Sequence, residues 1–520
     1  MSSAPKDPPS RAAESVGPVS FALSLILVLT VWRVGVLFVS PIGLYPEEAQ
    51  YWLWSRDLAF GYFSKPPMIA WLIGATTAIG GEGEALVRLS APLMHGLAAL
   101  GVLAAGRRLY GAREGALGAA LYILMPGVAL SSFVIATDAP LLAFLSLTLA
   151  AYAAGQTTGP RGRVPWAAAF GAMLGLAFLA KYAALYAIAG AALHAAWSPA
   201  ARKAWSPAAL AAAAVAFALV VAPNVVWNLT HGLQTVAHTA SNAGLETSRH
   251  FQLSRLAEFF GAQFGVFGPV PFAVLIGGAV LLARRNALAE PDRLLLSFAA
   301  PPLAIILVLA FVTHANANWA AAAYVPGAVL AAAWLVRWLP RARPWIVGAL
   351  VLQAAVAVVF LAGVTRPSLG DALGLGNSFK RARGWEELTR VVIERARVES
   401  GGGALTAVVT QDRFTFNSAA YYGRDAFGHD LPPLRMWVRG ADPRNQAEAV
   451  AALTPAQGAR VLVVSLDPAD TPRIEADFSR ILGRQIVSVR LDSRRSRRAE
   501  IFLAEGFHPA SRLAPAPPRR

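Results

Sequence analysis

Long apolar runs alternate with short polar stretches along the first 365 residues of this chain. About 20 apolar residues in a helix cover the hydrocarbon core of a bilayer, so the pattern predicts about eleven membrane-spanning helices. The runs that we interpret as spans are residues 20–39, 85–106, 115–133, 139–154, 166–180, 183–197, 207–226, 259–283, 294–313, 319–339 and 345–364.

The charged loops resolve an ambiguity in this count. The runs at 166–180 and 183–197 are short and also fit one long helix around Lys181. If they are two spans, every second loop is rich in arginine and lies on the same side as the N-terminus, as the positive-inside rule requires. One merged span would move the last two basic clusters to the opposite side. We therefore expect two spans, a cytoplasmic N-terminus and an extracytoplasmic C-terminus.

A polar stretch follows the first span and interrupts the apolar pattern. It contains adjacent acids at Glu47 and Glu48, a cation at Lys65 before two prolines, and Arg88 where the next apolar run begins. The predicted topology places this stretch outside the cytoplasm, together with most of the acids, histidines and asparagines that precede the C-terminal region. We expect this side of the membrane to carry the chemistry.

Two segments of the polar stretch predict helices that lie along the membrane surface. Residues 47–58 include Tyr51, Trp52 and Trp54, and such aromatic residues are favoured at the boundary between membrane and water. Residues 66–79 begin with two prolines, which a first helical turn accepts, and the segment is short for a membrane span.

After residue 364 the chain takes the pattern of a small α/β domain outside the membrane. The expected strands are 406–410, 461–466, 485–491 and 501–504, and the expected helices are 386–398 and 474–482. We divide the chain into a cytoplasmic tail (1–19), a transmembrane domain (20–365), an extracytoplasmic α/β domain (366–510) and a disordered tail (511–520). The expected fold class is a mainly α polytopic bundle with two interfacial helices in the first external loop.

Composition agrees with a polytopic membrane protein and argues against other classes. Hydrophobic residues make up 56% of the chain and charged residues 15%, which is too apolar a balance for a soluble protein of 520 residues. The net charge of +16 comes from short clusters between apolar runs and from the C-terminal third, which does not indicate nucleic acid as a partner. The lack of cysteine excludes disulfides, thiolate catalysis and cysteine-ligated metal.

Several motifs occur in the order found in a known group of enzymes. They are Y-P-E-E-A-Q-Y-W-L-W-S followed by G-Y-F-S-K-P-P-M-I-A-W-L, T-D-A-P at 137–140, L-G-L-A-F-L-A-K-Y at 174–182, P-N-V-V-W-N at 223–228 and N-W-A-A-A-A-Y at 318–324. The chain resembles a GT-C glycosyltransferase of the dolichyl-phosphate-mannose–protein mannosyltransferase superfamily. Within it, the chain resembles the bacterial branch with the lipid A aminoarabinose transferases and the lipopolysaccharide-core galacturonosyltransferases. The similarity covers about the first 365 residues, and the remainder is only loosely similar.

This resemblance implies a multi-pass protein of the bacterial inner membrane, with two surface helices in the first external loop and a periplasmic C-terminal domain. It implies a sugar donor on a polyprenyl phosphate, because nucleotide sugars are absent from that side. It further implies a glycolipid, lipopolysaccharide or protein acceptor in the cell envelope. A transporter or flippase of a charged lipid is the alternative, although its ionisable residues would be expected near the midplane of the spans. A binding or assembly protein is the third possibility.

The chemistry needs a carboxylate base for the acceptor hydroxyl and cations for the departing phosphate. The first-loop motif of the family usually reads Asp-Glu, and its Asp is the proposed base. Glu47 stands at that position, so the carboxylate is kept with one more methylene. Glu48 would orient Glu47 or help to bind the donor, and the alternative is that one or both acids cap or solvate the first surface helix. The resemblance puts Lys65 on the lipid phosphate, with a snorkelling lysine as the alternative; Arg88 shares that phosphate or pairs with a nearby acid.

Other candidates lie at the ends of later spans. Asp138 in T-D-A-P is a second catalytic carboxylate or an ordinary helix start, and Lys181 is phosphate-binding or structural. Possible contacts to the sugar or acceptor are Tyr62, Trp227, Asn228, His231, His314 and Asn318. The alternative is a loop anchor for Trp227, Asn228 and His231, and interfacial anchoring for His314 and Asn318. No cofactor is required, and a divalent metal stays open. His238, Glu246 and His250 have donor atoms, but their spacing matches no standard metal site.

Overall fold

The computed structural model describes residues 16–242, 251–440 and 442–509. They form two compact units. We call the first the helical unit; it takes its described residues from Met1–Phe38, Lys65–Ile69 and Arg88–Leu361. We call the second the mixed unit; it takes them from Val39–Ser64, Ala70–Val87 and Ala362–Arg520. The N-terminal tail to residue 15 and the segment 510–520 lie outside the described residues. The four-part domain division from the sequence stays a prediction.

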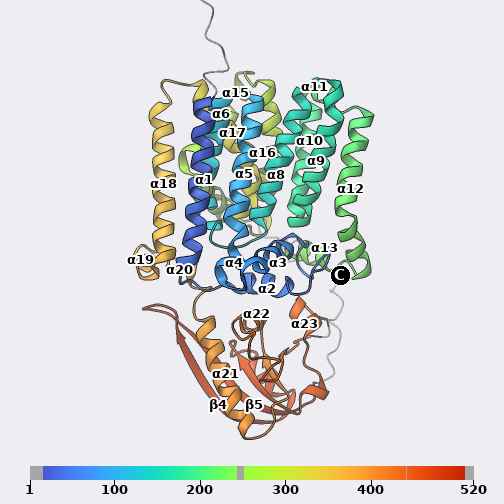
Figure 1. Cartoon of the computed structure of the whole chain (residues 1–520), viewed down its shortest axis with the longest axis vertical. Helices are drawn as coiled ribbons and strands as arrows, with labels where there is room; N and C mark the ends of the chain where they lie inside the picture. The colour runs from blue at the N-terminus through green and yellow to red at the C-terminus, as the bar shows by residue number, and fades with distance from the viewer. Residues whose placement is uncertain (1–15, 243–250, 441, 510–520) are drawn as a thin grey trace, which may run out of the picture. The chain divides into compact units, whose positions relative to one another are not determined.

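Helices build almost the whole helical unit (Figure 1). They are α1 (Val16–Val39), α5 (Ser90–Leu109), α6 (Ala112–Ile123), α7 (Pro126–Ser131), α8 (Asp138–Thr157), α9 (Pro160–Ala180), η2 (Tyr182–Leu185), α10 (Tyr186–Trp197), α11 (Pro199–Ala204), α12 (Pro207–Thr230), α13 (Gln234–Asn242), α14 (Leu253–Phe267), α15 (Pro269–Arg284), α16 (Glu290–Val312), η3 (Ala317–Ala323), α17 (Tyr324–Arg337) and α18 (Arg343–Thr365). Helices α5, α8, α9 and α12 pack against one another in that order. Helix α17 is buried along nearly its whole length and lies at the centre of the unit.

Among the described residues, eight helices are long and apolar enough to cross a membrane, or nine if one bent pair is a single span. A multi-pass bundle is therefore confirmed, whereas the count of about eleven is not. The predicted spans differ from the structure where the backbone breaks. The run 115–133 divides into α6 and α7 before Pro126, since proline cannot continue the helical hydrogen bonds. The run 183–197 is a shorter apolar helix.

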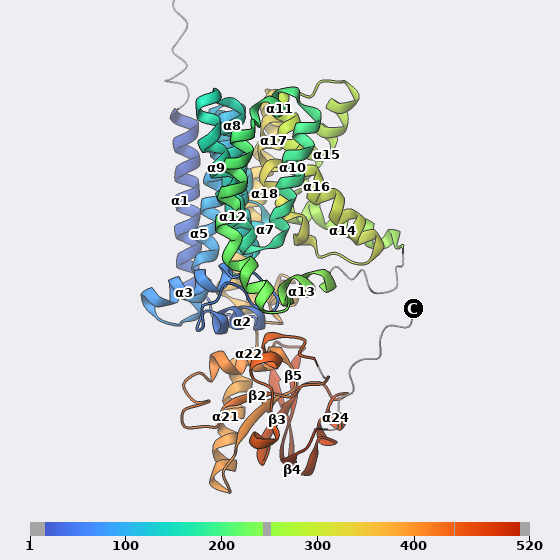
Figure 2. The same ribbon diagram turned by 90° about the vertical axis from the view of Figure 1, so that its right-hand side faces the viewer.

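The predicted span 259–283 contains the sharpest break. The chain bends by 118° between α14 and α15, and Figure 2 shows α14 turned out of line with α15. Gly268 sits at the corner with φ +102, a conformation that residues with a side chain rarely adopt, and Pro269 follows it. The break at Lys181, in contrast, was expected: α9 ends at Ala180 and Lys181 has extended backbone angles.

The mixed unit contains a five-stranded sheet in the order β2-β1-β3-β5-β4. Strands β2 (Leu434–Met436), β1 (Ala407–Thr410) and β3 (Arg460–Ser465) are parallel, and β5 (Ser496–Phe507) and β4 (Phe478–Arg490) continue the sheet antiparallel. Val408 lies opposite Leu434 on one side and Leu462 on the other. Alternate residues of the central strands face two separate apolar cores.

Helices accompany this sheet. They are α19 (Pro367–Ala372), α20 (Gly376–Phe379), α21 (Trp385–Gly401), α22 (Arg413–Tyr422), α23 (Gln446–Val450), η4 (Pro455–Gln457) and α24 (Thr471–Glu475). Figure 1 shows α21 beside β4 and β5. The α/β class, the helix at 386–398 and the four strands are confirmed. The helix expected at 474–482 is wrong, because α24 ends at Glu475 and Phe478 starts a strand that pairs with Phe507.

The polar stretch after the first span belongs to the mixed unit for most of its length. It forms α2 (Pro46–Trp54), α3 (Met68–Gly80) and α4 (Glu84–Arg88), so both expected helices are present. Helix α2 packs against α22, where the Trp52 and Tyr421 rings meet edge to face at 5.0 Å between centroids. The Tyr421 hydroxyl also donates to the backbone carbonyl of Glu82 at 2.7 Å. The loop and the C-terminal domain therefore pack as one body.

Gly43 is needed for this attachment. The Tyr422 hydroxyl accepts the N–H of Leu44 at 2.7 Å and donates to Glu84 at 2.6 Å. A Cβ atom at Gly43 would stand 2.6 Å from that hydroxyl oxygen and 3.2 Å from the carbonyl oxygen of Ala382. An added methyl group must displace the hydroxyl from both partners.

We predict that Gly43→Ala lowers the free energy of unfolding by about 1–3 kcal/mol, through overpacking and the loss of two hydrogen bonds. Thermal unfolding of the purified protein in detergent measures this change. Gly83→Ala is the matched control, because nothing lies within 4 Å of a Cβ atom at that glycine of the same loop. Equal unfolding temperatures for the two variants would contradict the packing argument.

Candidate active site

Glu47 and Glu48 occupy the first turn of α2, which Pro46 starts. Glu48 is fully buried and accepts the N–H of Tyr45 at 2.9 Å, which is the helix-capping role considered for it. The Glu47 side chain is 34% exposed and pairs with the guanidinium of Arg381. The two adjacent acids thus differ in exposure, and of the two only the Glu47 side chain is accessible to solvent.

Tyr62 organises the loop that follows α2. Its ring stacks on Trp54 with centroids 4.7 Å apart. Its hydroxyl lies 3.0 Å from the carbonyls of Trp54 and Asp57 and accepts the N–H of Ala59 at 3.0 Å. Burial raises the pKa of Tyr62. Its expected contact with a sugar or acceptor stays a prediction.

The raised pKa of Tyr62 predicts a pH-dependent contribution to stability. Tyrosine in an unfolded chain ionises at about pH 10, whereas the folded protein keeps Tyr62 neutral beyond that point. Its stabilising effect is complete below about pH 10 and is lost as pH rises through the folded pKa. We expect Tyr62→Phe to be less stable by about 1 kcal/mol at pH 8, with a gap to the wild type that narrows above about pH 10. Thermal unfolding between pH 8 and 11 tests this; a constant gap would contradict it.

Three of the predicted residues converge within the helical unit. The Lys181 ammonium lies 2.8 Å from one carboxylate oxygen of Asp138, and the Asn318 amide donates to the other at 3.0 Å. Asp138 starts α8, Lys181 sits between α9 and η2, and Asn318 belongs to η3. The side chains of Asp138 and Lys181 are 14% and 23% exposed. The structure thus joins three motifs separated by up to 180 residues into one polar cluster.

Lys65 and Arg88 also belong to the helical unit. Lys65 is partly buried just before Pro66 and Pro67, and Arg88 is 4% exposed at the last position of α4. A guanidinium at that depth cannot be an ordinary surface cation. Their expected role at a lipid phosphate stays a prediction.

The remaining candidates make local contacts. Trp227 and His231 stack with ring centroids 4.2 Å apart near the end of α12. The amide of Asn228 donates to the Tyr182 hydroxyl at 3.2 Å, which connects α12 to the segment after Lys181. The rings of His314 and Trp319 lie with their centroids 5.9 Å apart. None of these contacts by itself identifies a binding site.

The described residues contain no group of three or more His, Cys, Asp or Glu side chains placed to hold a metal ion. Of the loop residues considered for a metal, Glu246 and His250 lie outside the described residues, and His238 alone is described.

The sequence interpretation missed two polar features. His95 is fully buried in α5, with its ring nitrogens 3.2 Å from the Tyr122 hydroxyl and 2.6 Å from the Ser131 hydroxyl. A histidine inside an apolar run was the available signal. No sequence signal marked Arg381, the partner of Glu47, because it stands in a basic linker that resembles any solvated segment.

Comparisons with known proteins agree with these motifs. The family described as dolichyl-phosphate-mannose-protein mannosyltransferase matches residues 64–227. The lipid A galacturonosyltransferase RgtD of Rhizobium johnstonii is 38% identical over 409 residues, which cover 78% of this chain and 83% of that protein. ArnT from Cupriavidus metallidurans has a similar fold, with a TM-score of 0.62 and 18% identity in its apo structure, covering 95% of this chain and 98% of ArnT. Its structure bound to undecaprenyl phosphate matches with the same TM-score over 94% of this chain.

Proposed function

This chain belongs to the GT-C superfamily of membrane glycosyltransferases, and we propose that it transfers a sugar from a polyprenyl-phosphate donor to an envelope glycolipid. The similarity to a lipid A galacturonosyltransferase carries this proposal, because it extends through most of both chains. It makes a hexuronosyl unit the first sugar to test and lipid A the first acceptor. A fold like that of ArnT, which binds undecaprenyl phosphate, supports the donor class.

We assign the base to Glu47. In this proposal Glu47 takes the proton of the acceptor hydroxyl while that oxygen forms a bond to the anomeric carbon of the sugar. The bond from this carbon to the phosphate oxygen breaks, and the electron pair leaves with the polyprenyl phosphate. The exposure of Glu47 next to the buried Glu48 supports the choice.

We assign the departing phosphate to Lys65 and Arg88. Cationic side chains suit the negative charge that grows on this leaving group. For Arg88 the support is its burial, because a desolvated guanidinium interacts more strongly with an anion than an exposed one does. Lys65 is only partly buried, and the family resemblance supports its role.

We propose a role in donor binding for Asp138, Lys181 and Asn318 of the helical unit. Asp138 would bind sugar hydroxyls or position the donor, since a carboxylate accepts strong hydrogen bonds. Lys181 holds one of its oxygens and Asn318 the other. We further propose the bacterial inner membrane as the location, with the N-terminus in the cytoplasm and the residues after α18 in the periplasm. The arginine-rich alternate loops support this orientation.

Mass spectrometry of envelope lipids from cells with and without this protein tests the proposal. The expected result is one lipid A or core species that lacks a single sugar in the absence of the protein. Purified protein with polyprenyl-phosphate galacturonate and lipid A should restore that sugar. Unchanged envelope lipids and no transfer in vitro would refute the proposed reaction.

A further inference from the structure

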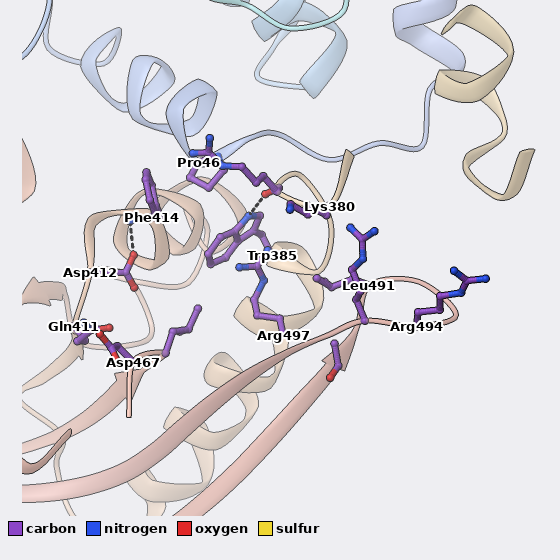
Figure 3. Close-up of a pocket in the computed structure, with 14 residues that line it drawn as sticks. Pro46, Lys380, Trp385, Gln411, Asp412, Phe414, Asp467, Leu491, Arg494 and Arg497 are labelled. Atoms are coloured by element: carbon purple, nitrogen blue, oxygen red, sulfur yellow. Dashed lines mark hydrogen bonds between the residues drawn. The ribbon is translucent and has the colours of Figure 1, made fainter. Parts of the chain in front are cut away.

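A cavity of about 820 Å³ opens within the mixed unit, and all the residues that line it belong to that unit. Residues of α21, the turn after β1, the start of α22 and the β4–β5 connection line it (Figure 3). Its volume is in the range of pockets that bind small molecules, about 300–1,000 Å³. It is large enough for a ligand of two sugar rings.

Positive charge dominates the lining of this cavity. The cations are Lys380, Arg381, Arg494, Arg495 and Arg497, and the acids are Asp412 and Asp467. Both acids already accept hydrogen bonds from the backbone. Asp412 caps α22 by accepting the N–H of Phe414 at 2.8 Å, and Asp467 accepts the N–H of Ala469 at 2.9 Å. Two of the five cations also pair with acids outside the lining, Arg381 with Glu47 and Arg495 with Asp492, so the positive charge is only partly compensated.

Two of these cations have side chains ready for a ligand. Lys380 and Arg494 are exposed, and within the described part of the chain neither side chain makes a hydrogen bond or an ion pair. Figure 3 shows Arg494 at the end of the β4–β5 connection and Lys380 on the same side of Trp385. An anionic ligand would gain charge-assisted hydrogen bonds there without breaking existing ones.

A buried donor and a buried acceptor without partners also belong to the lining. The Nε of Arg497 and the Oε1 of Gln411 lack hydrogen-bond partners among the described residues. Gln411 donates through its Nε2 to Asp470 at 2.7 Å, which fixes the direction of its amide. Buried polar atoms without a partner cost free energy, so they indicate a place where a ligand or water completes the hydrogen bonds. A ligand with hydroxyl groups satisfies both a donor and an acceptor.

The Trp385 ring contacts the Arg497 guanidinium in this lining. Its indole N–H donates to the Arg381 carbonyl at 2.7 Å, and the Arg497 guanidinium carbon lies 3.5 Å from the ring centroid. Burial lowers the pKa of Arg497 to about 10, so the group is still charged at neutral pH. Phe414 and Leu491 add apolar surface next to these polar groups. A sugar ring can use both kinds of surface, because it has apolar C–H groups as well as hydroxyls.

We propose that this cavity binds a saccharide that carries phosphate or carboxylate groups. The surplus cations select the anionic groups, and Gln411 and Arg497 complete hydrogen bonds to hydroxyls. Arg381 lines the cavity and pairs with Glu47, so one guanidinium connects the bound saccharide to the proposed base. The inference goes beyond sugar transfer, since binding needs neither donor nor turnover.

Calorimetric titration of the full chain in lipid nanodiscs tests the proposal. The probes are trehalose 6-phosphate, its neutral parent trehalose, and inorganic phosphate. We expect trehalose 6-phosphate to bind at least about tenfold more tightly than either of the others, because only it carries both a phosphate group and sugar hydroxyls. Lys380→Gln and Arg494→Gln should each weaken its binding about fivefold to tenfold.

Arg498→Gln is the matched control. Arg498 is an exposed cation on β5, next to Arg497 and outside the cavity lining, so its loss changes net charge equally. Undetectable binding of trehalose 6-phosphate, equal binding of inorganic phosphate, or an equal effect of the control variant would overturn the proposal. Competition by lipid A in the nanodisc would assign the cavity to a glycolipid head group. Specific binding without such competition would assign it to a free phosphosaccharide.

Discussion

Replacing Glu47 by glutamine is expected to reduce sugar transfer by about 10²–10⁴-fold, the usual contribution of a general base. Glutamine keeps the size of the side chain and its hydrogen-bonding oxygen but cannot accept the proton of an acceptor hydroxyl. Because Glu47 is 34% exposed and lies at a helix start, the variant should fold normally. Transfer of labelled sugar by purified protein measures the effect, and the unfolding temperature checks the fold.

Three further variants separate catalysis from structure. Glu47→Asp should keep substantial activity, because Asp is the usual residue at the position that Glu47 matches in the family motif. Arg381→Gln removes the ion pair but leaves the carboxylate, so its loss of activity should be at least about tenfold smaller than that of Glu47→Gln. Glu82→Gln, which affects a surface pair with Arg56, should stay near the wild type. Full turnover by Glu47→Gln would remove Glu47 from the mechanism.

The sequence was sufficient to predict a multi-pass bundle and to single out the residues of the polar cluster, but not to predict the number of spans. Apolar runs of membrane length specify helices because every backbone group in lipid must be paired within the segment. The motifs around Asp138, Lys181 and Asn318 stood at span ends on one predicted side of the membrane, and the structure brings these three side chains into contact. Their distances depend on helix packing, which no local pattern specifies.

Other features depend on tertiary contacts and could not be predicted in this way. The attachment of α2 to α22 joins residues more than 300 positions apart and is made by neutral side chains, as in the pair of Asn417 and Gln50. Residues 478–482 were expected to be helical, but pairing with β5 overrides their local preference. The corner at Gly268 interrupts a run whose hydropathy alone is continuous.

Breaking the ion pair between Asp138 and Lys181 is expected to have the second large effect, on the free energy of unfolding. Asp138→Asn and Lys181→Met each leave one partly buried polar group without its charged partner, and each should lower the free energy of unfolding by about 1–3 kcal/mol. The double variant should lose less than the sum of the two, with a coupling of about 1–2 kcal/mol. Glu387 and Arg390 on the surface of α21 provide the control pair, for which we expect no measurable coupling.

Activity in the same double variant distinguishes a bond that only holds helices from one that serves the reaction. If Asp138 binds the substrate, Asp138→Asn should lower transfer by about 10²-fold or more, and adding Lys181→Met should leave activity at that low level, although it costs less stability there than in the wild type. If the pair is only structural, activity should follow the unfolding temperature in all four proteins. Measuring both quantities on the four proteins decides between these roles, because the coupling in stability is expected in either case and only turnover separates them.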